Sequence, residues 1–343
     1  MKESKYSYYI TCLMSGMVEL GTVFLGITLH FNLTLIIGLA MAYQLGNILR
    51  FFVTEKIAKY QTLFSAITLL LSLIVLFTPD MEMVQFSTAC IMLILFSTIL
   101  QNIRSAVQGN IPRWKKRSCR VLGFILSSIV YSLGPVSLVV ASLILLFYSM
   151  SLEHFYYDNW YINWKAGNYG RKICWAMVTH QAHYFAYNYI MLFLTVTYFK
   201  NPYISAMWFV ANWIPYTITE PLVQKLKWDK WFTIAIGAHV FNAVVLISMY
   251  CALDLSFHTS LCLWVLTGFG GGNVFCIKKA LAPVIVYDKN VWSFSEQIGH
   301  ILGVFVALII AFIGIPEKSS LLAAVFFALA TIPIIMYTYR RNK

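Results

Sequence analysis

The chain has 343 residues, of which 60% are hydrophobic and 11% are charged, and its formal net charge is +12. A soluble globular domain carries about 25% charged residues, so this composition excludes one. The basic residues form short clusters between apolar runs, which is the positive-inside pattern of membrane proteins rather than a nucleic-acid-binding surface. We therefore expect an all-α integral membrane protein that binds membrane lipids and no nucleic acid.

Apolar runs follow one another along the whole chain, and a spanning helix needs about 20 mostly apolar residues. The runs fall at roughly 8–29, 33–53, 61–79, 84–103, 119–152, 172–198, 203–225, 231–252, 257–280, 291–314 and 318–338. All but one have the length of a single crossing. The exception, 119–152, is too long for one crossing and short for two.

The positions of the cations decide how often this run crosses. If it crosses twice, with a turn near Gly134-Pro135, every Lys and Arg except Lys200 and Lys318 lies inside or at the inner boundary. If it crosses once, all basic loops after residue 150 move outside and the bias is lost. The sequence therefore predicts 12 transmembrane helices in the cell (inner or plasma) membrane, with both termini in the cytoplasm.

The longest polar stretch divides these helices into six and six. We expect an N-terminal six-helix bundle at 1–152, a cytoplasmic aromatic-rich linker at 153–171 and a C-terminal six-helix bundle at 172–343. A short basic loop follows the second helix of each half. Two six-helix halves related as parallel repeats are the organisation of one large class of secondary transporters.

Two inner loops of the first half carry motifs of their own. Glu55-Lys56, with Lys59, forms an acidic-basic motif between the predicted second and third helices, and a basic segment at 111–123 leads into the predicted fifth. The major facilitator superfamily of transporters has an acidic-basic motif and a basic inner loop in these two places. The chain resembles that family there.

The resemblance extends over most of the chain. The segment 282–299 resembles the family's loop leading into helix eleven, and Gly134-Pro135 resembles the Gly-Pro of the helix-five motif found in its exporters. The resemblance implies a secondary transporter that moves a small molecule outward rather than inward. We expect it to act as a monomer and to need no cofactor.

Glu19 is the sharpest single candidate for a functional residue. It lies near the middle of the first predicted helix, with no other charge within about a dozen residues on either side. An unpaired carboxylate at the bilayer centre costs about 2.5–3.5 kcal/mol on insertion scales, so Glu19 is expected to be protonated, paired or facing water. Burial favours the protonated form, which suits a proton carrier. A structural hydrogen bond to a neighbouring helix is the alternative.

The matching helix of the second half holds His180 and His183, which share one helical face. A histidine pair can carry protons near neutral pH or bind a metal, but no further ligand is visible and no metal site is predicted. Interhelix hydrogen bonding is the structural alternative, and His239, which stands alone, is expected to be structural. The aromatic residues expected to line a substrate cavity with the pair are Tyr184, Tyr187, Trp208 and Trp213.

Glu296 and His300 lie four residues apart on one face of helix eleven and are expected to pair directly or to border the cavity. The residues expected to form an inner gate lie at the inner ends of the second helices and in the loop that follows: Arg50, Glu55, Lys56 and Glu220. Simple snorkelling of Arg50 to the membrane surface is an alternative.

The glycine-rich segment 268–273 has no strand before it and no Gly-Lys-Ser/Thr, so it is not read as a phosphate loop. Close helix packing or a flexible point in helix ten explains it better.

These features predict a secondary transporter that works by alternating access. A carboxylate among aromatic rings favours a small amphipathic or cationic organic solute. Glu19 suggests coupling to protons, and the Gly134-Pro135 match favours export. An uptake permease or a lipid translocase of the same fold is the alternative. A membrane-embedded lipid-modifying enzyme is less favoured, because the chain has no His box and no D-D-x-x-D motif.

Overall fold

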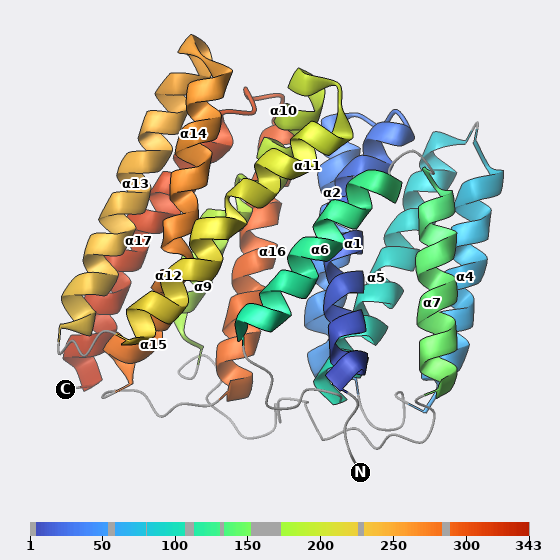
Figure 1. Ribbon diagram of the computed structural model, residues 1–343, viewed down its shortest axis with the longest axis horizontal. Coiled ribbons are helices and arrows are strands. Elements are labelled where there is room, and N and C mark those ends of the chain that lie inside the picture. The colour runs from blue at the N-terminus through green and yellow to red at the C-terminus, as the bar shows by residue number, and fades with distance from the viewer. Residues whose placement is uncertain are drawn as a thin grey trace. The chain divides into compact units, whose positions relative to one another are not determined.

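The computed structural model describes residues 5–53, 59–79, 81–106, 113–130, 134–151, 173–225, 230–282 and 289–342. Within these ranges every regular element is a helix (Figure 1). The first-half elements are α1 (Lys5–Thr28), α2 (Leu33–Leu49), η1 (Arg50–Phe52), α4 (Gln61–Phe77), α5 (Glu82–Ala106), α6 (Arg113–Val130) and α7 (Val136–Ser151). The second-half elements are α9 (Trp175–Phe185), α10 (Asn188–Phe199), α11 (Pro202–Ala211), α12 (Trp213–Lys225), α13 (Trp231–Leu255), α14 (Phe257–Thr267), η3 (Gly268–Gly272), α15 (Asn273–Leu281), α16 (Lys289–Ile313) and α17 (Ser319–Asn342).

Seven of the described helical segments are long and apolar enough to cross a membrane: α1, α2 with η1, α5, α13, α14 through α15, α16 and α17. Three more apolar helices, α4, α6 and α7, are shorter. Two predicted crossings are interrupted, since 172–198 forms α9 and α10 and 203–225 forms α11 and α12. The all-helical membrane protein is therefore confirmed. The count of 12 crossings is not, because short or broken helices fall below the length of about 20 residues that one crossing needs.

The ambiguous fifth run forms two helices. α6 ends at Val130 and α7 begins at Val136. Between them, Gly134 has a φ of +51°, a conformation that only glycine adopts without strain, and its carbonyl accepts a hydrogen bond of 3.0 Å from the Ser137 N–H. Pro135 then supplies the fixed φ that suits the approach to a helix. The turn predicted near Gly134-Pro135 is confirmed.

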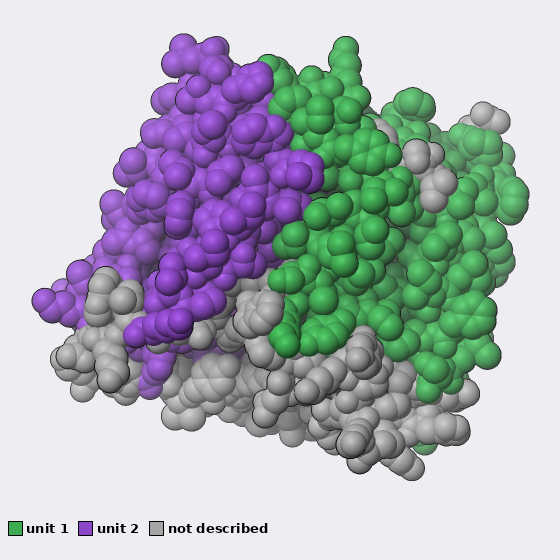
Figure 2. All heavy atoms as spheres, viewed as in Figure 1, with its two compact units in different colours: residues 1–163, 193–206 green, residues 164–192, 207–343 purple. Residues whose placement is uncertain are grey.

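Two compact units divide the chain (Figure 2). Unit 1 comprises Met1–Asn163 and Phe193–Ala206, and unit 2 comprises Trp164–Leu192 and Met207–Lys343. The linker expected at 153–171 lies outside the described residues, so the predicted bundle boundaries stay a prediction.

The helices of both units make contacts in the same order. In unit 1, α1 packs against α6, α2 against α5, and α4 against both α5 and α7. In unit 2, α9 packs against α16, α12 against η3, and α13 against both α14 and α17. The two patterns match when α9–α10, α11–α12 and α14–α15 are each treated as one interrupted helix. The two units therefore share these contacts: first with fifth, second with fourth, third with fourth and sixth. They differ in that α9 also packs against α17, whereas α1 also packs against α2.

A glycine marks the same crossing point in each unit. A methyl group built on Gly123 of α6 would lie 2.1 Å from the Leu13 carbonyl oxygen and 2.9 Å from the Met17 nitrogen. One built on Gly303 of α16 would lie 2.5 Å from the Ala182 oxygen and 2.8 Å from the Ala186 nitrogen. In both units a glycine on the fifth helix thus presses on the backbone of the first, as small residues do where membrane helices pack closely.

Candidate functional site

Glu19 lies on α1, which is apolar on both sides of it, and only 3% of the residue is exposed. Its Oε2 atom accepts a hydrogen bond from Arg120 Nη2 of α6, forming an ion pair. The Arg120 side chain is 26% exposed, whereas that of Glu19 is 4% exposed. Of the three states expected for Glu19, the structure has the paired one, because a buried charge requires a partner.

Close helix packing brings the two charges together. A methyl group on Gly16 would lie 2.1 Å from the Arg120 carbonyl oxygen, and Gly123 makes the reciprocal approach to α1. Gly16 precedes Glu19 by three residues and Gly123 follows Arg120 by three, so each glycine lies one turn from the charge on its own helix. The glycines therefore set the spacing at which the ion pair forms.

Polar groups from α2 and α5 lie around the pair. The Tyr43 and Ser15 hydroxyls are 3.0 Å apart and fully buried, and they join α2 to α1. Arg104 of α5 donates to the Tyr8 hydroxyl at 3.3 Å, with its guanidinium 5.7 Å from the centre of that ring. These bonds connect α1 to two further helices of its unit.

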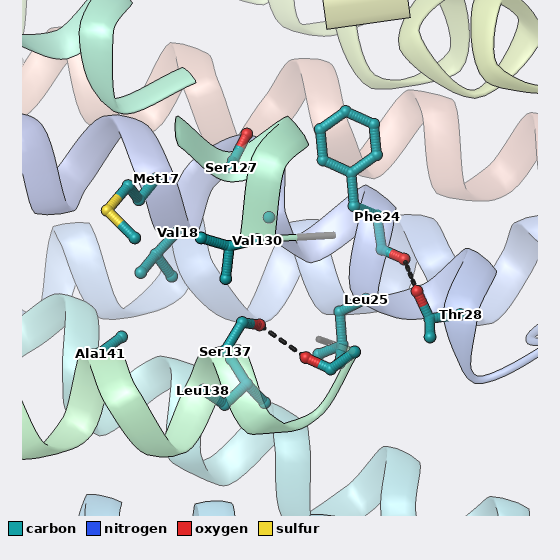
Figure 3. A pocket seen from close by; sticks show the side chains of 12 residues that line it. Met17, Val18, Phe24, Leu25, Thr28, Ser127, Val130, Ser137, Leu138 and Ala141 are labelled. Atoms are coloured by element: carbon teal, nitrogen blue, oxygen red, sulfur yellow. Dashed lines mark hydrogen bonds between the residues drawn. The ribbon is translucent and has the colours of Figure 1, made fainter. Parts of the chain in front are cut away.

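A pocket in unit 1 was not anticipated from the sequence (Figure 3). It lies among α1, α6 and α7. Its described walls are apolar apart from the hydroxyls of Thr28, Ser127 and Ser137. Each of these hydroxyls donates to a carbonyl of its own or preceding turn, that of Phe24, Phe124 or Gly134. The walls therefore offer apolar surface and a few oxygen acceptors.

Three buried histidines meet in unit 2. His180 Nδ1 lies 3.1 Å from His239 Nε2, His183 Nδ1 contacts the His180 carbonyl, and His239 Nδ1 lies 2.6 Å from the Ala235 carbonyl oxygen. The ring centre of His180 lies 5.0 Å from that of His183 and 5.2 Å from that of His239. His239 was expected to be a separate structural histidine. It is bonded to its own helix, and it also joins the predicted pair.

The hydrogen bonds of this histidine cluster (His180, His183 and His239) assign its protons. A carbonyl can only accept, so His183 and His239 each donate from Nδ1–H. A neutral His239 then has a lone pair on Nε2, and His180 must donate to it from its own Nδ1–H. All three rings therefore carry the proton on Nδ1, with the Nε2 lone pairs of His180 and His183 left as acceptors. The described residues include no group of three His, Cys, Asp or Glu arranged to hold a metal ion.

The helix that carries His180 and His183 is held from two sides. Thr331 of α17 donates to the Thr179 hydroxyl at 2.9 Å. On α16, a methyl group on Gly299 would lie 2.4 Å from the Val178 carbonyl oxygen. His300 Nε2 lies 3.3 Å from Gln181 Oε1. The histidine cluster is therefore built on a rigidly packed helix.

Breaks in the other helices of unit 2 lie close to one another. Asn212 separates α11 from α12, and its amide donates to the Trp264 carbonyl and the Thr267 hydroxyl, both at 2.6 Å. The helix of Trp264 then tightens into η3, where a methyl group on Gly268 would lie 2.0 Å from the Asn212 carbonyl oxygen. The close packing expected for the glycine-rich segment is present, and it joins two interrupted helices.

Only some of the aromatic residues predicted to line a substrate cavity lie together near the breaks in the helices of unit 2. Tyr187, at the break between α9 and α10, is buried and packs edge-on against Trp264, with ring centres 5.7 Å apart. Tyr184 packs against Tyr187 in the same way at 5.9 Å. Trp213 is buried at the start of α12, 5.4 Å from the Tyr216 ring, whereas Trp208 is half-buried on α11.

The remaining predicted residues that the structure describes contact other side chains. Glu296 pairs with Lys278 of α15 at 3.2 Å, while His300 stacks on Phe185 with ring centres 3.9 Å apart. Arg50 donates to Gln101 at 3.1 Å. Glu55 and Lys56 lie outside the described residues, as does the side chain of Glu220, so the inner gate stays a prediction.

No family model matches the chain, and no curated protein matches its sequence. Solved structures do share its fold. A bacterial metal transporter is 12% identical over 99% of both chains, with a TM-score of 0.60. A bacterial homologue of the iron transporter ferroportin in its outward-facing state is 10% identical over 98% of both chains, with a TM-score of 0.59. A variant of the nucleoside transporter NupG is 16% identical over 97% of this chain and 98% of its own, with a TM-score of 0.62.

All three of these solved structures are named as transporters, and the chain shares their fold over nearly its whole length. The resemblance predicted from the sequence is thereby confirmed at the level of fold. At 10–16% identity it says nothing about which solute this chain carries.

Proposed function

We propose that this chain, which has the fold of the major facilitator transporters, is a secondary transporter that moves a small organic solute by alternating access. The observation that carries the proposal is the placement of buried ionisable and polar groups on the first helix of each unit. Glu19 lies on α1, and His180 and His183 lie on α9. Such groups are costly within a membrane and mark the pathways of substrates and protons.

We further propose that the chain crosses the cell membrane 12 times, with both termini in the cytoplasm. In this proposal a monomer exports the solute and couples export to protons. Glu19 and the histidine cluster are the proposed proton-binding groups. Support for export comes from the Gly134-Pro135 turn, which resembles the exporter motif. Uptake of the same solute by the same fold is the alternative direction, and lipid translocation the alternative cargo.

The charge of the solute is less constrained than the sequence suggested. A cationic solute was favoured because the Glu19 carboxylate was expected to lie among aromatic rings. Arg120 balances that charge within the same unit, so electrostatics no longer require the solute to be positive. An amphipathic organic molecule still suits the aromatic side chains around Tyr187 and Trp264.

The test begins with the solute, because it is unidentified. Metabolites that accumulate inside a strain lacking the gene, and fall when the gene is restored, are loaded into liposomes containing the purified protein. A proton-coupled exporter should move one of them at a rate that follows the imposed pH gradient. Failure of the deletion strain to take up a solute that it does not accumulate would favour uptake instead.

Glu19→Gln tests the proton-binding role. The variant should reach the membrane and lose the response to the pH gradient. Transport with unchanged pH dependence would remove Glu19 from the mechanism and leave the histidine cluster as the proton-binding group.

A further inference from the structure

Two asparagines next to the histidine cluster lack the hydrogen bonds that burial demands. Asn242 of α13 is 2% exposed and Asn273 of α15 is 3% exposed. Among the described residues, neither Asn242 Oδ1 nor Asn273 Nδ2 has a hydrogen-bond partner. A buried polar atom without a partner carries its full desolvation penalty, so each such atom requires an explanation.

Both asparagines lie on the seam between α13 and the interrupted helix α14–η3–α15. A methyl group built on Gly270 would lie 2.6 Å from Asn242 Nδ2, so the η3 backbone passes directly over that amide. Ser256 joins α13 to α14, and the two helices pack side by side and antiparallel (Figure 1). Asn273 follows Gly270 by three residues, and such residues eclipse each other in a 3₁₀ turn. It therefore faces α13 as well.

The register of this pair places Asn273 near the histidine cluster. In an antiparallel pair, three residues forward on one helix correspond to about three residues back on the other. Asn273 is therefore level with His239, as Gly270 is with Asn242. One turn further, the same register sets Ile277 against Ala235, and these two residues do share a buried core cluster. Asn242, Asn273 and His239 thus form one polar stripe, joined to His180 through the bond to His239.

With the histidines in the neutral form assigned above, the stripe carries no charge but offers both kinds of hydrogen-bonding group. Asn242 Oδ1 needs a donor, Asn273 Nδ2 needs an acceptor, and the free Nε2 lone pair of His180 needs a donor. If the oxygen and nitrogen of an asparagine amide are interchanged, the amide still has one acceptor and one donor group.

From this we infer that Asn242 and Asn273, with the histidine cluster, form a binding site for an uncharged polar solute bearing both hydrogen-bond donors and acceptors. The site names a class of substrate for the proposed transporter. That this ligand is the transported solute rests on the proposed function, whereas its binding does not. Binding can be measured on the protein without any transport.

The experiment compares matched probes that differ in charge. Thermal unfolding of the purified protein in detergent is followed with uridine or glucose and with their charged counterparts, uridine monophosphate and glucose 6-phosphate. The neutral member of at least one pair should raise the unfolding temperature, and its phosphorylated counterpart should not. Equal stabilisation by a phosphorylated member would overturn the inference, and so would the absence of any shift with all four probes.

Substitutions then separate a ligand contact from a structural one. Asn242→Leu and Asn273→Leu replace unpartnered amides with apolar groups of similar volume, so each variant should unfold at or above the wild-type temperature. Each should also bind the neutral probe about tenfold more weakly, because one hydrogen bond to the ligand is lost.

The matched control is Asn212→Leu, whose amide is fully bonded to Trp264 and Thr267 and should unfold at a lower temperature than the wild type. If Asn242→Leu and Asn273→Leu unfold early as this control does, their amides serve the fold through interior water and the inferred site does not exist.

Discussion

Glu19 and Arg120 form a buried pair in which each charge depends on the other. Glu19 is the more buried partner, so removing Arg120 or Glu19 leaves an uncompensated charge in an apolar setting. The sequence identified Glu19 because a lone carboxylate in an apolar run is rare. It could not identify its partner, because Arg120 is 101 residues away and the contact depends on helix packing.

A double-mutant cycle measures this dependence. Breaking a buried pair costs about 3–5 kcal/mol, and the partial exposure of Arg120 reduces the expected loss for Glu19→Leu to about 1–3 kcal/mol. Glu19→Leu combined with Arg120→Leu should recover most of that loss, as measured by thermal unfolding in detergent. Losses that simply add would mean that the two charges act independently.

The histidine cluster makes a prediction that needs no substrate. When the cluster is neutral, its hydrogen bonds require the Nδ1–H tautomer in His180, His183 and His239. Nitrogen NMR of protein labelled at histidine, with resonances assigned by single His→Gln variants, reports which nitrogen carries each proton. A signal from Nε2–H in any of the three would contradict the assigned network.

At the scale of the helices, the contact between α1 and α6 is held by glycines rather than by large side chains. Gly16 presses on the Arg120 carbonyl, whereas the space around Gly21 on the same helix is open, with no neighbouring atom within 4 Å of a methyl group built there. These two glycines therefore form a matched pair for testing the contact.

We expect Gly16→Ala and Gly21→Ala to change stability in opposite directions. Gly16→Ala should destabilise by about 1–3 kcal/mol, because its methyl group overlaps a backbone carbonyl that cannot move aside. Gly21→Ala should stabilise by about 0.5–1 kcal/mol, because alanine lowers the entropic cost of a helical position. Thermal unfolding measures both. Equal effects at the two positions would mean that α1 and α6 do not pack as described.

The helices themselves were largely predictable, because runs of apolar residues are a local property of the sequence. The turn at Gly134-Pro135 was predictable for the same reason, since a glycine at positive φ followed by proline is a local signal. The glycine-rich segment was recognised as a point of close packing or flexibility in helix ten. The break at Asn212 was not placed, because it depends on bonds between helices distant in sequence. His239 and Asn242 were not predicted as site residues, because their contacts also join helices distant in sequence. An isolated polar side chain in an apolar helix was nevertheless a usable signal.

At the scale of the whole molecule, the repeated contact order agrees with a chain built from two related sets of helices. Contacts between helix ends agree with the predicted topology. Asp254 and Lys318, both predicted to face outward, form an ion pair at 2.5 Å that raises the pKa of Lys318. Arg104, predicted to lie at the inner face, is bonded to Tyr8, where the first predicted crossing begins. Each contact joins ends that the charge bias assigns to one side.

The transport proposal depends on the membrane topology, meaning the number of crossings and the side on which each loop lies. Reporter domains that are active on only one side of the membrane can be fused after residues 150 and 343, and inserted at 256 and 317. Twelve crossings with cytoplasmic termini predict that the first two reporters are active inside and the second two outside. If the reporters at 150 and 343 appear on opposite faces, the number of crossings is wrong and alternating access between two six-helix halves is excluded.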